Sequence, residues 1–141
     1  MTSSLLVAMQ FALVALVVAR ATPSLAGAAG VALLAASAAV GFWALAANRP
    51  GNFNIRPEPR PGGSLVTHGP YRWVRHPMYL AVLLFTAAFA TAGDSWQWLA
   101  WAALVAVLFA KAWREERGMA LAHPGYADYR ARTHAILPFI L

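Results

Sequence analysis

The sequence contains no cysteine, which excludes disulfide bonds, thiolate nucleophiles and cysteine-bound metals. Its four histidines show no His-x-x-x-His or Glu-x-x-His spacing, so no metal site is expected. Charged residues form only 11% of the 141 residues, against about a quarter in soluble domains. Hydrophobic residues reach 60%, and this balance indicates a membrane protein with one domain, residues 1–141.

Acidic residues are scarce as well, because five Asp and Glu stand against eleven Lys and Arg. A net charge of +6 can indicate nucleic acid as a partner, but in membrane proteins basic residues more often set topology and contact anionic lipid. All basic residues except Arg20 fall between Arg49 and Arg75 or between Lys111 and Arg132. We therefore expect membrane lipids as partners, no nucleic acid, and both basic stretches in the cytoplasm.

Long apolar runs predict an all-α integral membrane fold with four transmembrane helices. The expected helices cover about residues 3–20, 25–47, 77–92 and 96–113. The last two runs are short for a full crossing, which leaves open whether both cross completely. A cleaved signal peptide is the alternative for the first run, and the absence of Lys or Arg before its apolar core disfavours it.

The segments between and after these runs are polar. Residues 48–76, rich in proline and glycine, predict an extended cytoplasmic loop, and residues 114–141 predict a helical segment that lies over the cytoplasmic face. Four crossings then place both termini in the cytoplasm, with the chain in an inner or cytoplasmic membrane. Gly27, Gly30 and Gly41 permit close helix packing, either within one chain or in a homodimer.

The third expected helix begins at an unusual dipeptide, His76-Pro77. Pro77 suits the first helical turn and biases His76 away from helical geometry, so Arg75 and His76 should lie at the helix N-terminus. Unpaired amides and the helix dipole attract anions there, and Arg75 adds a fixed positive charge. The pattern predicts a carboxylate or phosphate guest, with Tyr79 on the same side of the first turn. An ordinary positively charged membrane flank is the alternative.

Two adjacent carboxylates, Glu115 and Glu116, end the fourth expected helix. Because adjacent positions cannot share one helix face, we expect one carboxylate to turn toward the bundle and the other to meet solvent or a basic partner. The inward one would suit a ligand ammonium. The alternative is a solvated pair with Arg117, worth under about 1 kcal/mol. In the tail, Tyr126 and Tyr129 alone indicate an interfacial amphipathic segment.

Together these residues resemble the isoprenylcysteine carboxyl methyltransferase family and related phospholipid methyltransferases, over about residues 62–138. The shared motifs, in chain order, are Gly69-Pro70-Tyr71, Arg75-His76-Pro77-Met78-Tyr79, Glu115-Glu116, Tyr126, Tyr129, Arg132 and Pro138. Three places depart from the family pattern: Ala81, His123-Pro124-Gly125 and Ala135. These departures concern the shape of the pocket and the acceptor more than the use of the cofactor.

The resemblance implies S-adenosylmethionine as cofactor, with S-adenosylhomocysteine as product, in a pocket that the cytoplasmic C-terminal helical segment covers. It implies that the cofactor is bound by Tyr71, His76, Pro77, Tyr79, Glu115, Glu116, Tyr126 and Tyr129. It also implies catalytic roles for Arg75 and Glu116, which would hold charged groups of the cofactor or of the acceptor. The implied activity is methyl transfer to a lipophilic acceptor arriving from the bilayer.

The acceptor stays open between two chemistries. An isoprenylcysteine-like carboxylate is the first expectation, since its methylation depends on positioning more than on acid or base catalysis. An aminophospholipid is the second, and its ammonium would first lose a proton to a base such as His76 or a glutamate. A third interpretation is a non-catalytic membrane scaffold or lipid-binding module, which would lack affinity for the cofactor.

Overall fold

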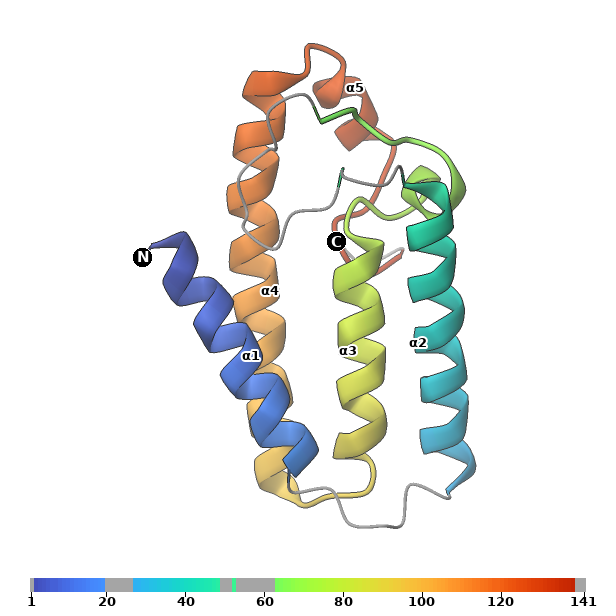
Figure 1. Ribbon diagram of the computed structural model, residues 1–141, viewed down its shortest axis with the longest axis vertical. Helices are drawn as coiled ribbons and strands as arrows, with labels where there is room; N and C mark the ends of the chain where they lie inside the picture. Colours follow the sequence, from blue (N-terminus) through green and yellow to red (C-terminus); the bar gives the residue numbers. More distant parts are fainter. Residues whose placement is uncertain (1, 20–26, 49–51, 53–62, 139–141) are drawn as a thin grey trace.

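The apolar runs form four long helices in the computed structural model, which describes residues 2–19, 27–48, 52 and 63–138 (Figure 1). These helices are α1 (Ser3–Ala19), α2 (Ala28–Ala47), α3 (Pro77–Ala90) and α4 (Ser95–Ala122). A short 3-10 helix, η1 (Gly69–Arg72), precedes α3, and the six-residue helix α5 (Tyr126–Ala131) follows α4. Over these ranges no sheet forms, and Val74 and His134 make an isolated parallel bridge.

The all-helical expectation is confirmed. Two helices, α2 with 20 residues and α4 with 28, are long and apolar enough to cross a membrane. The other two apolar helices are shorter, with 17 residues in α1 and 14 in α3. A full crossing takes about 20 residues, so the crossing of the bilayer by all four helices stays a prediction.

The fourth helix is longer than the sequence analysis expected. The prediction of a helix at 96–113 followed by a separate segment from residue 114 was wrong, because α4 continues to Ala122. Hydropathy falls after Lys111, but the residues that follow are mostly strong helix formers, and the helix ends before His123-Pro124. At its start, the side chains of Asp94 and Gln97 form a capping box. The separate part of the C-terminal segment therefore begins only at His123.

Two other helix ends differ from the expected boundaries. Gly27 has extended backbone geometry and caps α2, which therefore begins at Ala28 and not at residue 25. Helix α3 ends at Ala90, and Thr91 and Ala92 already belong to the turn toward α4. The expected first helix ended at Arg20, which lies outside the described residues, as do residues 49–51 and 53–62 of the expected loop 48–76.

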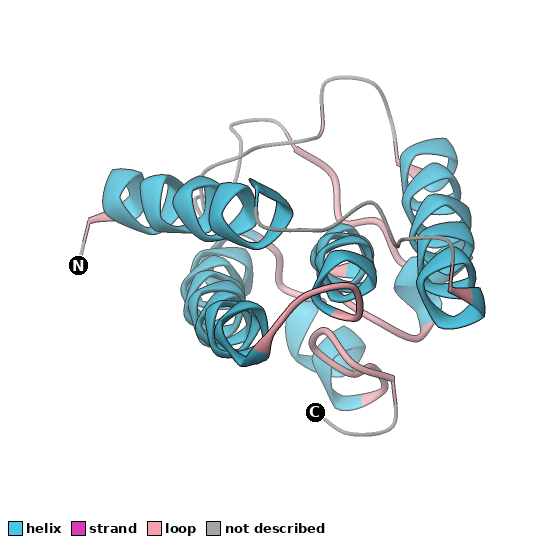
Figure 2. Cartoon of the chain, turned by 90° about the horizontal axis from the view of Figure 1, so that it is seen from below, coloured by secondary structure: helices cyan, strands magenta, loops and turns pink. Residues whose placement is uncertain are grey.

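The helices pack as a layered bundle in which α2 lies along α3, and α1 lies across α4 (Figures 1 and 2). Helices α3 and α4 join the two pairs through a core of buried side chains. That core consists of Leu83, Leu104, Leu108, Ala112 and Ile136. Because Ile136 belongs to the tail, the C-terminal segment is anchored in the same core as the long helices.

Small residues let α2 and α3 approach closely. The Ser37 hydroxyl donates a hydrogen bond of 2.8 Å to the carbonyl oxygen of Ala81, and a Cβ atom built at Gly41 would lie 3.7 Å from the Ala81 Cβ. Ala81, one of the departures from the family pattern, thus faces α2. Gly41 packs within the chain, and the homodimer stays a prediction.

Gly69 allows η1 to pack against the end of α2. Its backbone has a φ of +61°, and a Cβ atom at this position would lie 2.7 Å from the Ala47 Cβ. Both features select glycine, since a side chain there meets strain as well as a clash. The approach matters for the site, because η1 leads directly into Arg75 and His76.

We expect Gly69→Ala to destabilise the protein by about 2 kcal/mol or more, from left-handed backbone strain and overlap with α2. The measurement is the melting temperature in detergent, followed by tryptophan fluorescence. Gly27→Ala is the matched control, because a Cβ atom there meets nothing within 4 Å. Equal melting temperatures for the two variants would contradict the tight approach of η1 to α2.

Candidate active site

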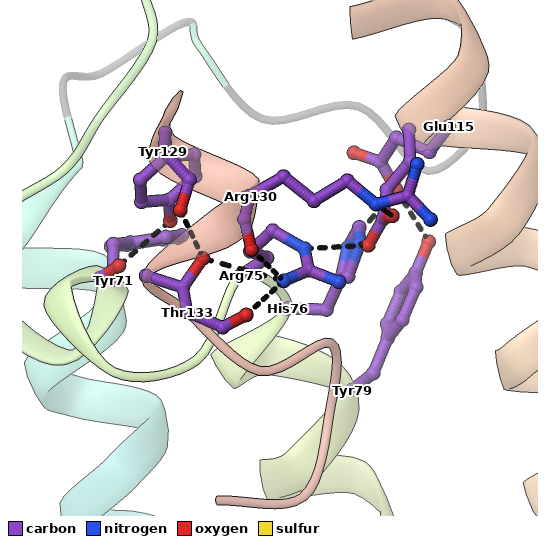
Figure 3. A network of polar contacts seen from close by, with 9 residues as sticks. Tyr71, Arg75, His76, Tyr79, Glu115, Tyr129, Arg130 and Thr133 are labelled. Atoms are coloured by element: carbon purple, nitrogen blue, oxygen red, sulfur yellow. Dashed lines mark hydrogen bonds and ion pairs between the residues drawn. The ribbon is translucent and has the colours of Figure 1, made fainter. Parts of the chain in front are cut away.

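The predicted site residues gather at one end of the bundle, where α3 begins and α4 ends (Figure 3). His76 caps α3 with non-helical backbone angles, and Pro77 occupies the first turn, as the sequence predicts. His76 is buried, with 8% of its surface exposed. The expected placement of Arg75 and His76 at a helix N-terminus is therefore confirmed.

The C-terminal tail is joined to this helix start through the backbone. The amides of Arg75 and His76 donate to the carbonyl oxygens of His134 and Ala135, at 2.8 and 2.9 Å, and the His134 amide donates to Trp73 at 2.9 Å. These bonds satisfy backbone groups just ahead of α3. They also bring residues some 60 positions apart along the chain into fixed register.

Glu116 is the centre of the polar network. Its side chain is 6% exposed, and Oε1 lies 2.7 Å from Nε of Arg75 and 3.3 Å from Nε2 of His76. Oε2 lies 3.3 Å from Nε of Arg130, a residue of α5 whose side chain is 58% exposed. A buried carboxylate needs such partners, because an unpaired charge inside a protein is very costly.

Arg75 carries the network into the tail. Besides Glu116, its guanidinium donates to the carbonyl oxygen of Arg130 at 3.2 Å and to the backbone carbonyl of Thr133. Figure 3 shows Arg75 at the middle of these contacts. One side chain thus links α3, α4 and α5.

Glu115 also faces α3, so the expectation that only one of the two carboxylates would turn toward the bundle was wrong. Its Oε2 accepts a hydrogen bond of 3.0 Å from the Tyr79 hydroxyl and lies 3.5 Å from Nδ1 of His76. The His76 and Tyr79 rings are stacked, with centres 5.2 Å apart. Adjacent helix positions are about 100° apart, which lets Glu115 and Glu116 contact opposite sides of the same imidazole.

Three buried tyrosines form another wall of the site. The Tyr129 hydroxyl donates to the carbonyl oxygen of Tyr71 at 2.7 Å, and the rings of Tyr126 and Tyr129 meet edge to face. Burial raises the pKa of Tyr71, Tyr126 and Tyr129 above the ordinary value. All three therefore present neutral hydroxyls and aromatic faces at physiological pH.

A cavity lies between these groups. Of the residues that the sequence analysis assigned to the cofactor or to catalysis, those that line the cavity are Tyr71, Arg75, His76, Pro77, Tyr79, Glu115, Tyr126 and Tyr129. Glu116 is absent from the lining and lies behind Arg75 and His76. Arg132 is also absent, since its side chain is exposed and donates to the Asp128 carbonyl oxygen.

Sequence reasoning missed several residues of the site. Asn48 and Asn52 both line the cavity. The Asn52 side chain forms hydrogen bonds with the Asn48 side chain and with the backbone of Ser64, so these three residues lie together. Arg130 and Thr133 hold Glu116 and Arg75. The spaced arginines of the tail were visible in the sequence, but nothing in the sequence marked which of them would reach Glu116.

The fold and the site together define a class of protein, namely a helical membrane protein with a polar cavity at one end of its bundle. The phospholipid methyltransferase family model matches residues 24–123, which is most of the chain, so the protein belongs to this family of membrane methyltransferases. The family is part of the isoprenylcysteine carboxyl methyltransferase-like superfamily, so the resemblance noted from the motifs is confirmed.

A curated relative shares part of this sequence. Over 84 residues the chain is 37% identical to the cobalt-zinc-cadmium resistance protein CzcN of Cupriavidus metallidurans. The aligned part covers 56% of this chain and 38% of that protein, so the chain spans well under half the length of the relative. No solved structure matches the chain.

The two glutamates should differ when each is neutralised. We expect Glu116→Gln to destabilise the protein by about 3 kcal/mol, because Arg75 loses its buried counter-charge. Glu115→Gln should cost under about 1 kcal/mol, since its side chain is 31% exposed and the amide oxygen can still accept from Tyr79. Melting temperatures in detergent measure both, and an equal loss would remove Glu116 from the centre of the network.

Proposed function

We propose that this protein transfers the methyl group of S-adenosylmethionine to a lipophilic acceptor at the cytoplasmic surface of the membrane. The observation that carries the proposal is the cavity at the start of α3, where Arg75, His76 and Glu115 meet three neutral tyrosines in a chain of a methyltransferase family. When bound there, S-adenosylmethionine supplies an electrophilic methyl group on a sulfonium.

The lining residues fit the parts of this cofactor. Arg75 and His76, at the N-terminus of α3, suit its carboxylate. Glu115 is the partly exposed carboxylate of the site, and it suits the ammonium or the sulfonium. Tyr126 and Tyr129 offer aromatic faces for the adenine ring.

The first candidate acceptor is a lipid-bearing carboxylate, of the isoprenylcysteine kind. A carboxylate oxygen forms a bond to the methyl carbon while the bond from carbon to sulfur breaks and its electron pair stays on sulfur. No proton moves, so the site needs positioning and charge more than a base. The Arg75 guanidinium supports this candidate, because a fixed positive charge in the lining attracts an anionic acceptor to the cavity.

The second candidate is an aminophospholipid, and the family to which the chain belongs supports it. Here the nitrogen must lose a proton before it forms the new bond to carbon. Glu115 is suited to receive that proton, because it lines the cavity and its side chain is 31% exposed. His76 is less suited, since its two ring nitrogens lie 3.5 and 3.3 Å from carboxylate oxygens.

The basic residues support a cytoplasmic position for the cavity. Arg72 of η1, Arg75, Arg117 of α4 and Arg130 of α5 all belong to the elements at this end of the bundle. In membrane proteins an excess of Lys and Arg marks the cytoplasmic side. A lipophilic acceptor in the inner leaflet would then meet the cavity at the depth where α3 begins.

Calorimetric titration of the detergent-purified protein with S-adenosylmethionine and S-adenosylhomocysteine tests the cofactor. We expect saturable binding of both, weakened about tenfold or more by His76→Ala, which removes the ring that stacks on Tyr79 and faces both glutamates. His68→Ala is the matched control, because His68 is exposed and lies outside the cavity lining. A folded wild type that binds neither compound would favour a non-catalytic scaffold.

The acceptor is tested with labelled S-adenosylmethionine and two lipid probes, N-acetyl-S-farnesylcysteine and vesicles of phosphatidylethanolamine. We expect label in the farnesylated probe, released as methanol by mild alkali, because a methyl ester hydrolyses and an N-methyl group does not. Alkali-stable label in the phospholipid would instead establish the amine as acceptor. A wild type that binds the cofactor and labels neither probe would exclude both chemistries.

A further inference from the structure

Lys111 is a buried cation inside the bundle, one helical turn before Glu115 on α4. Its surface is 1% exposed, and its ammonium donates to the side-chain oxygen of Gln10 on α1. The ammonium also lies 5.2 Å from the centre of the Tyr79 ring. An ionisable side chain within an apolar helix bundle is costly, and such residues usually serve a function.

The contacts of Lys111 lead to the cavity. Lys111 does not line it, but Tyr79 does, and the Tyr79 hydroxyl donates to Glu115, a second lining residue. Residues four apart on a helix are neighbours, so the Lys111 charge also lies beside Glu115. Lys111 thus contacts the ring of Tyr79 and lies beside Glu115. It does so from the inner side of the bundle.

Holding α1 in place does not explain this arrangement. At the other end of the same helix pair, the Gln97 side chain donates to the Val17 carbonyl oxygen at 3.4 Å, about 21 Å from Lys111 along α4. Leu6 and Val17 of α1 are also buried. An apolar pair at positions 10 and 111 would pack the helices with less desolvation than a lysine.

We propose that Lys111 and Gln10 form a positioning pair that fixes Tyr79 and Glu115 at the edge of the cavity. The inference rests on the proposed cofactor site. It makes α1 part of that site, although the family match begins at residue 24, after α1. Gln10 orients the ammonium, the ammonium fixes the ring of Tyr79, and the hydroxyl of Tyr79 holds Glu115 toward the ligand.

The experiment measures S-adenosylhomocysteine affinity by calorimetry and melting temperature in detergent, on the same preparations of the full chain. The variants are Lys111→Met, Lys111→Arg and the double variant Gln10→Leu with Lys111→Met. Gln97→Leu is the control, because it cuts another polar contact between α1 and α4 and removes the capping box of α4, far from the cavity. Lys111→Met should weaken binding about tenfold, the scale of a desolvated cation–π contact.

The double variant separates positioning from stability. Replacing both partners of a buried hydrogen bond by apolar groups is nearly neutral, so its melting temperature should match wild type. Its affinity should stay about tenfold low, while Lys111→Arg should bind within about threefold of wild type. Gln97→Leu should melt earlier and bind normally.

Two results would overturn the inference: wild-type affinity in the double variant, or equal loss of affinity in Gln97→Leu. A wild type that binds no S-adenosylhomocysteine would reject the proposed function itself. That result is separate, because it appears before any variant is compared.

Discussion

A buried carboxylate held by three basic side chains is the constraint on which the site depends. Glu116 lies within 3.3 Å of Arg75, His76 and Arg130, which come from the start of α3 and from α5. The buried charges of Glu116 and Arg75 would each be costly alone, so the network forms only when α3, α4 and the tail come together. Arg75 then extends it to the backbone of residues 130 and 133, and the wall formed by Tyr126 and Tyr129 follows from that attachment.

Glu115, the neighbour of Glu116, lies at the surface of the cavity. Glu115 lines it, keeps part of its surface exposed and contacts Tyr79, whereas Glu116 stays behind the wall. Two adjacent residues of α4 therefore supply a structural counter-ion, Glu116, and a cavity-facing carboxylate, Glu115. His76 lies between the two, so its position is fixed from both sides. A site of this kind is preorganised, because its charged groups are oriented before a ligand arrives.

Local sequence signals predicted the local features of this structure. Apolar runs indicated the helices, and His76-Pro77 indicated the start of α3. Contacts between distant segments left no such signal: the bridge between Val74 and His134 uses backbone groups, which any residue carries. Lys111 resembled one more basic residue at a membrane boundary, and only its contacts with Gln10, 101 residues earlier, and with the Tyr79 ring show that it faces inward. The end of α4 was misjudged because hydropathy reports burial in lipid, whereas helix propensity carries the helix on to Ala122.

Part of the site lies within residues 24–123, which the family model matches, and part lies in the segments on either side. This division bears on the choice of acceptor. Residues 24–123 hold the start of α3 and both glutamates, the charged parts of the site. Gln10 and the two tail tyrosines lie outside this range, and the sequence departs from the family pattern at His123-Pro124-Gly125, beside Tyr126. His123 and Tyr126 both line the cavity, so this departure changes its wall directly. The region that the family model matches therefore supplies the charged part of the site, while the flanking segments supply Tyr126 and Tyr129 of its aromatic wall and shape the remaining space.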